Sequence, residues 1–475
     1  MITFLVCLAA LVTAYFTYGK YLERQAGADN SRPTPSARLA DGVDYIPMPR
    51  WRVFLIQLLN IAGTGPIFGA ILGACFGPVA FLWITLGGIF FGAMHDYLSG
   101  MMIVRDDGRS LPEVVGDYLG SGTRRVMRWF SLALLVLVGA VFILSPAQLM
   151  STLVTGIGTT AWVWIILAYY VLATVMPVDK IIGKLYPLFG IALVIMALAL
   201  LGVLIFDAGT YSIPELDLHN HHLNARDFPI IPTLCITIAC GAISGFHATQ
   251  SPMMARCVRT ERECRSVFYG SMISESVIAL IWAAIAMAFF HGTDGLNSAL
   301  AENDNNAAWA VNAISHTTLG GIGAVLAILG VVAAPVTSGD TAFRSARLIV
   351  ADMFKIDQKP LLKRLLVALP LFVVGFAITQ VQFDVVWRYF AWANQTLAAI
   401  VLWAIYDWLR RRRKNVWIAL VPALFMTFIV TSFVFISPQF VGLDATWYAY
   451  AAGAAVTLFI ACAVMRRKTA GLSPD

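Results

Sequence analysis

The sequence predicts an all-helical, multi-pass membrane protein, and two observations carry this prediction. Of its 475 residues, 59% are hydrophobic and 13% are charged, about half of the roughly 25% charged residues of a typical soluble domain. The mean hydropathy is +0.76, and about thirteen apolar stretches approach or exceed the roughly 20 residues that a spanning helix needs. The composition excludes a secreted disulfide scaffold, a disordered chain and a nucleic-acid-binding domain.

The predicted spans follow one another along the whole chain, and we number them first to thirteenth. They lie at about 1–21, 51–77, 78–103, 126–156, 160–177, 184–206, 229–255, 266–292, 316–343, 361–380, 383–409, 415–437 and 446–465. The first span lacks the basic start and the small-residue cleavage site of a signal peptide, so we interpret it as a retained helix.

The distribution of Lys and Arg predicts the orientation of the chain. With the N-terminus outside, 31 of the 33 basic residues fall in inside segments. The exceptions are Arg226 in an outside loop and Arg388 in the eleventh span. Because inside loops of membrane proteins are enriched in basic residues, we expect the N-terminus outside and the C-terminus in the cytoplasm.

Two spans are interrupted near their middle. The second contains Gly-Thr-Gly-Pro at 63–66, where Pro removes a backbone donor and Gly favours non-helical geometry. The seventh contains Ser-Gly-Phe-His at 244–247. Irregular backbone is not tolerated in contact with lipid, so both interruptions are expected to line an internal cavity. The alternative is that the glycines only permit close helix packing.

The two interrupted spans are five helices apart and run in opposite directions across the membrane. This arrangement predicts two inverted five-helix repeats, at 51–206 and 229–409. An extra helix at 1–21, a cytoplasmic segment at 22–50 and two C-terminal helices at 415–465 flank them. Paired interruptions of this kind indicate the binding site of a transporter, because half-helix N-termini attract anions and half-helix C-termini attract cations.

The ninth span carries two adjacent hydroxyl side chains, Thr337 and Ser338, near Pro335. Hard cations prefer oxygen ligands. The two hydroxyls, together with backbone carbonyls at the second-span interruption beginning at Ala62, therefore form a candidate cation site. The alternative is that both hydroxyls bond back to their own helix.

Ionisable residues within the predicted spans are functional candidates because burying them in a membrane is costly. His247 lies at the seventh-span interruption and titrates near neutral pH, which suits proton coupling or a bond to a substrate carboxylate. Glu275 in the eighth span is interpreted as a proton carrier or as a hydrogen-bonded structural acid. His95 and Asp96 are interpreted mainly as gating or structural residues, with transport chemistry as the alternative.

Two further groups have structural interpretations. Arg388 in the eleventh span is expected to pair with Asp384, one helical turn earlier. His219, His221 and His222 lie together in an outside loop. A solvated loop is the expected state of these histidines, and a zinc site is the alternative. The seven cysteines lack metal-site or redox-motif spacing and are interpreted as small core residues.

Several short motifs, in order from about residue 40 to about 400, resemble the carbon starvation (CstA) family of bacterial inner-membrane transporters. They are Asp-Gly-Val-Asp-Tyr-Ile-Pro at 41–47, Ile-Ala-Gly-Thr-Gly-Pro at 61–66, Gly-Ala-Met-His-Asp-Tyr at 92–97, Arg-Asp-Asp-Gly-Arg-Ser-Leu at 105–111, Gly-Ala-Ile-Ser-Gly-Phe-His at 241–247 and Ala-Trp-Ala-Asn-Gln at 391–395. The resemblance implies kinship with the amino acid–polyamine–organocation superfamily and its LeuT-like inverted-repeat fold.

The resemblance also implies secondary uptake of peptides or of small carboxylates such as pyruvate. We therefore expect a transporter of the bacterial inner membrane that works by alternating access, coupled to protons or sodium, and not an enzyme. The alternatives are an intramembrane metal-dependent enzyme with His95, Asp96 and His247 as ligands, and a channel or sensor. Apart from Na⁺ or H⁺ as coupling ion, no cofactor or metal is expected. The expected partners are the small-molecule substrate and the lipid bilayer.

These arguments assign three sets of site residues. The expected substrate-binding residues are Gly63, Thr64, Gly65, Pro66, Ser244, Gly245, His247, Asn394 and Gln395. The expected ion- or proton-coupling residues are Ala62, Thr337, Ser338, His247 and Glu275. The expected gating or structural residues are His95, Asp96 and Arg388.

Overall fold

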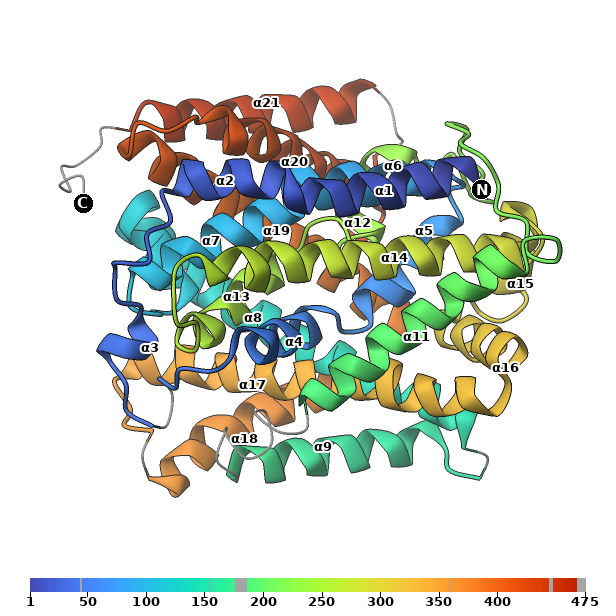
Figure 1. The fold of residues 1–475 in the computed structure, drawn as a ribbon, viewed down its shortest axis with the longest axis horizontal. Helices are drawn as coiled ribbons and strands as arrows, with labels where there is room; N and C mark the ends of the chain where they lie inside the picture. Colours follow the sequence, from blue (N-terminus) through green and yellow to red (C-terminus); the bar gives the residue numbers. More distant parts are fainter. Residues whose placement is uncertain (43–44, 155, 176–185, 359, 444–446, 468–475) are drawn as a thin grey trace.

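The computed structural model is a bundle of helices, most of which run side by side along one direction (Figure 1). It describes residues 1–475 except 43–44, 155, 176–185, 359, 444–446 and 468–475. The described residues contain α-helices and short π-helical segments, which are labelled η, and no strand. This confirms the predicted all-helical fold class.

The first half of the chain forms the elements that precede the long connection at 207–229. They are α1 (Ile2–Phe16), α2 (Tyr18–Ala26), α3 (Pro35–Arg38), α4 (Arg50–Ile61), η1 (Gly65–Gly69), α5 (Ala70–Ala74), α6 (Val79–Leu82), η2 (Trp83–Gly92), α7 (Ala93–Arg105), α8 (Leu111–Leu153), α9 (Thr159–Val175) and α11 (Tyr186–Phe206). Within α8, Gly120 has a φ of 90°, which kinks the helix.

The second half begins with another interrupted span. Its elements are η3 (Ile230–Leu234), α12 (Cys235–Thr237), α13 (Gly245–Ala255), η4 (Arg265–Tyr269), α14 (Gly270–Phe289), α15 (Thr293–Ala301), α16 (Ala307–Leu326), η5 (Ala327–Val332), α17 (Ala333–Phe354), α18 (Leu361–Ile378), α19 (Phe383–Arg411), α20 (Trp417–Ile436) and α21 (Trp447–Met465).

Helices occupy all thirteen predicted spans, but fewer qualify as membrane spans by themselves. Among the described residues, eight helices are long and apolar enough to cross a membrane, or up to ten if each of two bent pairs is one span. The remaining three predicted spans correspond to the short helix α9, to the interrupted pair α12 and α13, and to α19, which carries several polar residues.

The predicted bounds of the ninth span, 316–343, are wrong. The structure has α16 up to the glycine-rich stretch 320–323 and then a helix from Ala327 to Phe354, and these two pieces are bent by 116°. Gly320 has a φ of 59°, a conformation that breaks the helix at this point. The helix that carries Thr337 and Ser338 is therefore shifted toward the C-terminus by about 11 residues at each end.

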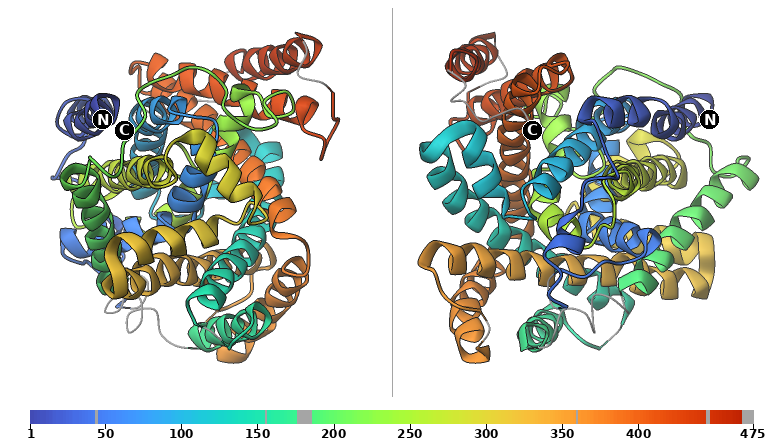
Figure 2. Two further views of the ribbon diagram at one scale, coloured as in Figure 1. Left: turned by 90° about the vertical axis from the view of Figure 1, so that its right-hand side faces the viewer. Right: turned by 60° about the vertical axis from the view of Figure 1, so that its left-hand side comes forward.

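The most buried helices form the middle of the bundle. α7 packs against α13 and α14, and both α13 and α14 pack against α4 of the first broken span. Nearly every residue of α7 and α13 is buried. α20 and α21 lie at one edge of the bundle, and α9 and α18 lie at the opposite edge (Figures 1 and 2). The two interrupted spans thus lie inside the protein, away from its lipid-facing rim.

Candidate functional site

The first break separates α4 from η1 at residues 62–64 and bends the span by 58°. The Gly63 N–H bonds the Ile61 carbonyl at 3.0 Å, so the Leu59 carbonyl does not receive its usual bond from four residues later. The Ser338 hydroxyl of α17 donates to that carbonyl instead, at 2.9 Å. The break predicted at 63–66 is confirmed, and its non-helical residues start one position earlier.

The second break is longer and separates α12 from α13 at residues 238–244. Gly241 has a φ of 96°, and Ser244 is extended just before the first turn of α13. His247, which the sequence placed in the interruption, lies in that first turn. The break is displaced because the chain starts to unwind at Ile238, upstream of the predicted position.

Two adjacent residues of α19 hold the ends of the second break. The Asn394 side-chain oxygen accepts bonds from the Phe246 N–H at 2.7 Å and from the Ser244 hydroxyl at 3.1 Å. The Gln395 amide donates to the Cys235 carbonyl at 3.0 Å. The bonds to the Phe246 N–H and to the Cys235 carbonyl satisfy backbone groups that a helix end leaves without partners. Asn394 and Gln395, expected in the substrate site, thus brace the broken helix itself.

The two breaks face each other at the centre of the molecule. A Cβ atom added to Gly65 would collide with the Cys240 side chain, and one added to Gly241 would lie 3.9 Å from Pro66. Thr64 is 1% exposed and Ser244 is completely buried. The breaks are therefore in direct contact, and this conformation closes the centre to solvent.

A chain of ionisable side chains lies next to this contact. His95 Nδ1 and Asp96 Oδ1 are 2.8 Å apart, and Asp96 Oδ2 and His247 Nδ1 are also 2.8 Å apart. His247 Nε2 is 3.4 Å from Glu275 Oε2. All four side chains are 0% exposed. α7, α13 and α14 thus contribute to one buried chain of two carboxyl groups and two imidazoles.

His95, Asp96 and His247, the metal ligands of the alternative enzyme hypothesis, do not surround a common point, since both imidazoles use Nδ1 to bond the two oxygens of Asp96. In the described part of the chain, the group with metal-ligand spacing is instead Cys240, His247 and Glu275, whose ligand atoms lie within 4.8 Å of one another. Sequence reasoning treated Cys240 as a core residue, and no motif spacing relates it to Glu275.

The candidate cation site in α17 is less open than the sequence suggested. The Thr337 hydroxyl donates to the Ala334 carbonyl at 2.8 Å, as the back-bonding alternative predicts. The single O–H of Ser338 is shared between the Ala334 and Leu59 carbonyls, each at 2.9 Å. Ser338 also reaches the first broken span through its bond to Leu59. One helical turn further, Asp340 forms a buried ion pair with Arg344 at 3.1 Å, a pair that the sequence analysis did not identify.

Arg388 lines a cavity of about 450 Å³, together with Trp387 and Ala391 of α19, residues of α5 and α20, and the loop at 222–228. The side chain of its expected partner Asp384 lies outside the described residues. In the histidine loop at 219–222, His221 Nε2 is 2.9 Å from Asp217 Oδ2. The pKa of Asp217 is lowered, mainly by its hydrogen bond from the His219 backbone N–H and secondly by its bond to the His221 side chain.

Gln57 and Asn60, on the last two turns of α4, are polar residues that sequence reasoning missed. Both are fully buried, and neither side-chain amide has a hydrogen-bond partner within the described ranges. Buried amides are normally bonded. Their spacing of three residues, just before the Gly-rich break, was the sequence signal that could have placed both amides on one buried face of the helix.

Comparison with known proteins relates most of the chain to one family. A family model described as carbon starvation protein CstA matches residues 1–158 and 144–321. An uncharacterized membrane protein of Haemophilus influenzae is 42% identical over 349 residues, which cover 63% of this chain and 94% of that protein. The peptide transporter CstA of Escherichia coli is 25% identical and covers 87% of this chain and 77% of its own length.

A solved structure supplies the fold. The crystal structure of MhsT in complex with L-phenylalanine matches with a TM-score of 0.57 and 14% sequence identity, over 88% of this chain and 98% of MhsT. This likeness agrees with two interrupted spans in contact at the centre of a helical bundle. The chain belongs to the carbon starvation protein CstA family and has a LeuT-like fold.

Proposed function

We propose that this protein is a secondary active transporter that takes up a small carboxylate or a short peptide together with protons, by alternating access. The observation that carries the proposal is the buried chain His95–Asp96–His247–Glu275 beside the two breaks. Ionisable groups at this depth are costly unless they serve a purpose, and proton relays in transporters use such groups.

These four side chains are of the types that proton coupling needs. Asp96 holds both imidazoles by Nδ1, which leaves His247 Nε2 directed at Glu275. A proton on His247 would lie between two carboxyl groups, and an anionic substrate nearby would favour its retention. The N-terminus of α13 adds the positive end of a helix dipole at the same place.

The relatives support the transported class. The Escherichia coli and Campylobacter jejuni relatives are both named peptide transporters, and MhsT was solved with a bound amino acid. Peptides, amino acids and pyruvate-like acids share a carboxylate, which is the group that the positive end of α13 would attract. We propose that the protein lies in the bacterial inner membrane, with its N-terminus outside.

Protons are favoured over sodium by the state of the α17 hydroxyls. Thr337 and Ser338 both donate to backbone carbonyls, and Ser338 bonds the Leu59 carbonyl that the first break leaves free. In this proposal the site formed by the first break and the α17 hydroxyls is a former cation site that no longer binds an ion. Uptake should therefore be independent of sodium.

The test is uptake by proteoliposomes of labelled pyruvate, alanyl-alanine and a tripeptide, with an imposed proton gradient, an imposed sodium gradient or neither. Wild type is compared with His247→Ala at equal protein content, and with His316→Ala, which alters an exposed histidine of α16. We expect His247→Ala to lose proton-driven accumulation while exchange partly survives, and His316→Ala to match wild type.

Three results would contradict the proposal. Identical rates and pH profiles for wild type and His247→Ala would remove His247 from the coupling. Accumulation driven by sodium alone would instead assign the coupling to the α17 site. Absence of accumulation with every gradient and all three substrates would reject this substrate class.

A further inference from the structure

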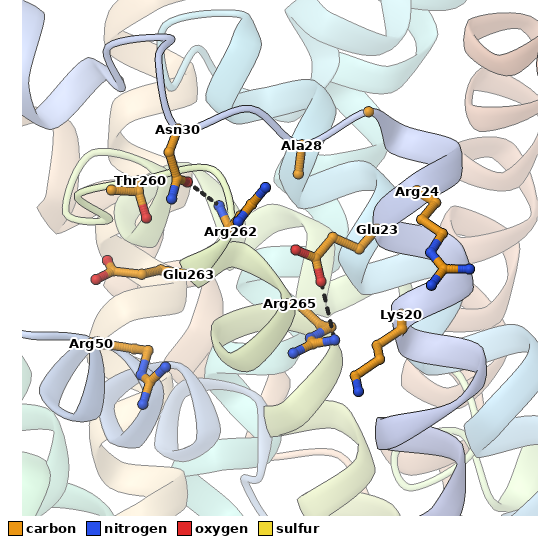
Figure 3. A pocket seen from close by; sticks show the side chains of 11 residues that line it. Lys20, Glu23, Arg24, Ala28, Asn30, Arg50, Thr260, Arg262, Glu263 and Arg265 are labelled. Atoms are coloured by element: carbon orange, nitrogen blue, oxygen red, sulfur yellow. Dashed lines mark hydrogen bonds and ion pairs between the residues drawn. The ribbon is translucent and has the colours of Figure 1, made fainter.

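A second cavity, distant in sequence from the central cluster, lies among the chain segments that the charge distribution places inside. It has a volume of about 640 Å³ and is lined by the end of α2, the start of α4 and the loop at 260–265 that leads into α14. Figure 3 shows Arg50 on one side of this hollow and Lys20 and Arg24 on the other. Three segments far apart in the chain thus converge on it.

The lining has an excess of positive charge. Lys20, Arg24, Arg50, Arg262 and Arg265 face two acids, Glu23 and Glu263. Arg265 is neutralised by Glu23 at 3.1 Å, and Glu263 accepts a bond from the Arg259 backbone N–H. Within the described ranges the other four cationic side chains form no ion pair. These four residues are exposed to solvent. Like charges repel, and an anion in the hollow would be attracted by all four.

The neighbouring surface indicates the depth of the cavity in the membrane. α1, which precedes the helix α2 that lines the cavity, exposes Phe16 at 57% at its near end, as a lipid-facing helix would. Trp51, next to Arg50, is 54% exposed. Exposed Trp residues are enriched at the level of lipid headgroups. The hollow therefore lies where the apolar rim of the bundle meets the inside surface.

We propose that this basic cavity binds the phosphate headgroup of an anionic phospholipid of the inner leaflet. Basic pockets between spanning helices on the cytoplasmic side suit such headgroups. The helix that begins at η4 and continues through α14 directs its N-terminal end toward the same hollow, which also favours an anion.

The position gives the lipid a structural role. Arg50 is the first residue of α4, the inner half of the first broken span. Arg262 lies in the loop that connects α13, the inner half of the second broken span, to α14. A phosphate between these arginines would tie the inside ends of both broken spans together and oppose their separation.

The test measures lipid retention by native mass spectrometry of the purified full-length protein. Phosphatidylglycerol is titrated against phosphatidylcholine, and inorganic phosphate and glycerol 3-phosphate are added in separate arms. The variant Lys20→Gln/Arg50→Gln/Arg262→Gln removes one charge from each segment. We expect about a fivefold loss of phosphatidylglycerol affinity per charge, on the order of a hundredfold in total.

The matched control is Arg125→Gln/Lys363→Gln/Lys414→Gln, which removes three exposed charges on the same expected side but outside the cavity. It should retain wild-type affinity. If the first triple variant does not fold, Lys20→Gln and Arg50→Gln are measured singly, and Arg50→Lys should restore binding.

Three outcomes would overturn the proposal. Equal retention of the two lipids would show that the cavity does not select an anion. An equal loss in the control variant would assign the selectivity to overall surface charge. Binding of inorganic phosphate or glycerol 3-phosphate that displaces the lipid at similar concentration would assign the cavity to a soluble phosphate compound. None of these outcomes depends on transport, so the proposed function is tested separately.

Discussion

The two broken spans differ in the length of the break and in its surroundings. The break after α4 spans three residues and is supported by hydroxyl groups: Ser338 bonds Leu59, and Ser145 lies 3.3 Å from Thr64. The break before α13 spans seven residues, is braced by the amides of α19 and touches the ionisable chain. Both spans are interrupted, but within the described residues the buried ionisable side chains lie beside the second break.

The largest effect is expected at the acid that joins the two imidazoles. Asp96→Asn keeps the shape of the side chain but removes its charge, and only one of its two side-chain atoms can still accept a bond. We expect loss of proton-driven uptake and a destabilisation of about 3–5 kcal/mol, typical of a broken buried pair. Uptake and thermal unfolding in detergent measure the two effects.

Asp106→Asn is the matched control for that prediction. Asp106 follows the same helix, α7, and pairs with Arg109 at 2.9 Å, but it is partly exposed. Partly exposed pairs contribute about 0–1 kcal/mol. If Asp96→Asn reduces uptake and stability no more than Asp106→Asn does, the ionisable side chains beside the second break do not carry the coupling.

The amide brace of the second break gives the next effect. Asn394→Ala leaves the Phe246 N–H and the Ser244 hydroxyl without their acceptor in the protein interior. We expect a destabilisation of about 2–3 kcal/mol, measured by thermal or denaturant unfolding. Thr396→Ala on the same helix removes only a bond to its own backbone and should cost less than about 1 kcal/mol. Equal costs would mean that α13 does not need the brace.

The contact between the breaks can be tested from the first one. Gly65→Ala adds a Cβ that collides with Cys240, and overpacking of this kind costs about 1–3 kcal/mol. Cys240→Gly should recover part of this loss in the double variant, with a coupling of at least about 0.5 kcal/mol. Gly122→Ala, where the added atom meets open space, is the control. Additive effects of Gly65→Ala and Cys240→Gly would contradict the contact.

The smallest effect is expected at the hydroxyl that supports the first break. Ser338→Ala removes the bond to the Leu59 carbonyl, which should cost about 1 kcal/mol. Thr337→Ser keeps the hydroxyl that bonds only within α17 and serves as the comparison. A gain of sodium-stimulated uptake in either variant would contradict a braced, inactive site.

How far the sequence could anticipate these features depends on the distance between the partners. Gly and Pro encode the breaks locally, so both were predicted to within a few residues. The bond between Asp96 and His247 joins residues 151 positions apart, and only the packing of α7 against α13 creates it. The start of α17 was misplaced because apolar residues continue through Gly320, where the backbone turns. The repeat bounds and the membrane orientation stay predictions.

Cys240, at the contact of the two breaks, gives this protein a native reporter of its own opening. Six of the seven cysteines are buried, Cys240 among them, and Cys462 is exposed. A water-soluble maleimide should therefore alkylate Cys240 only when the breaks separate and water reaches this thiol. The alkylation rate of Cys240, determined by peptide mass analysis, would follow the conformational cycle in unmodified protein, without an introduced probe.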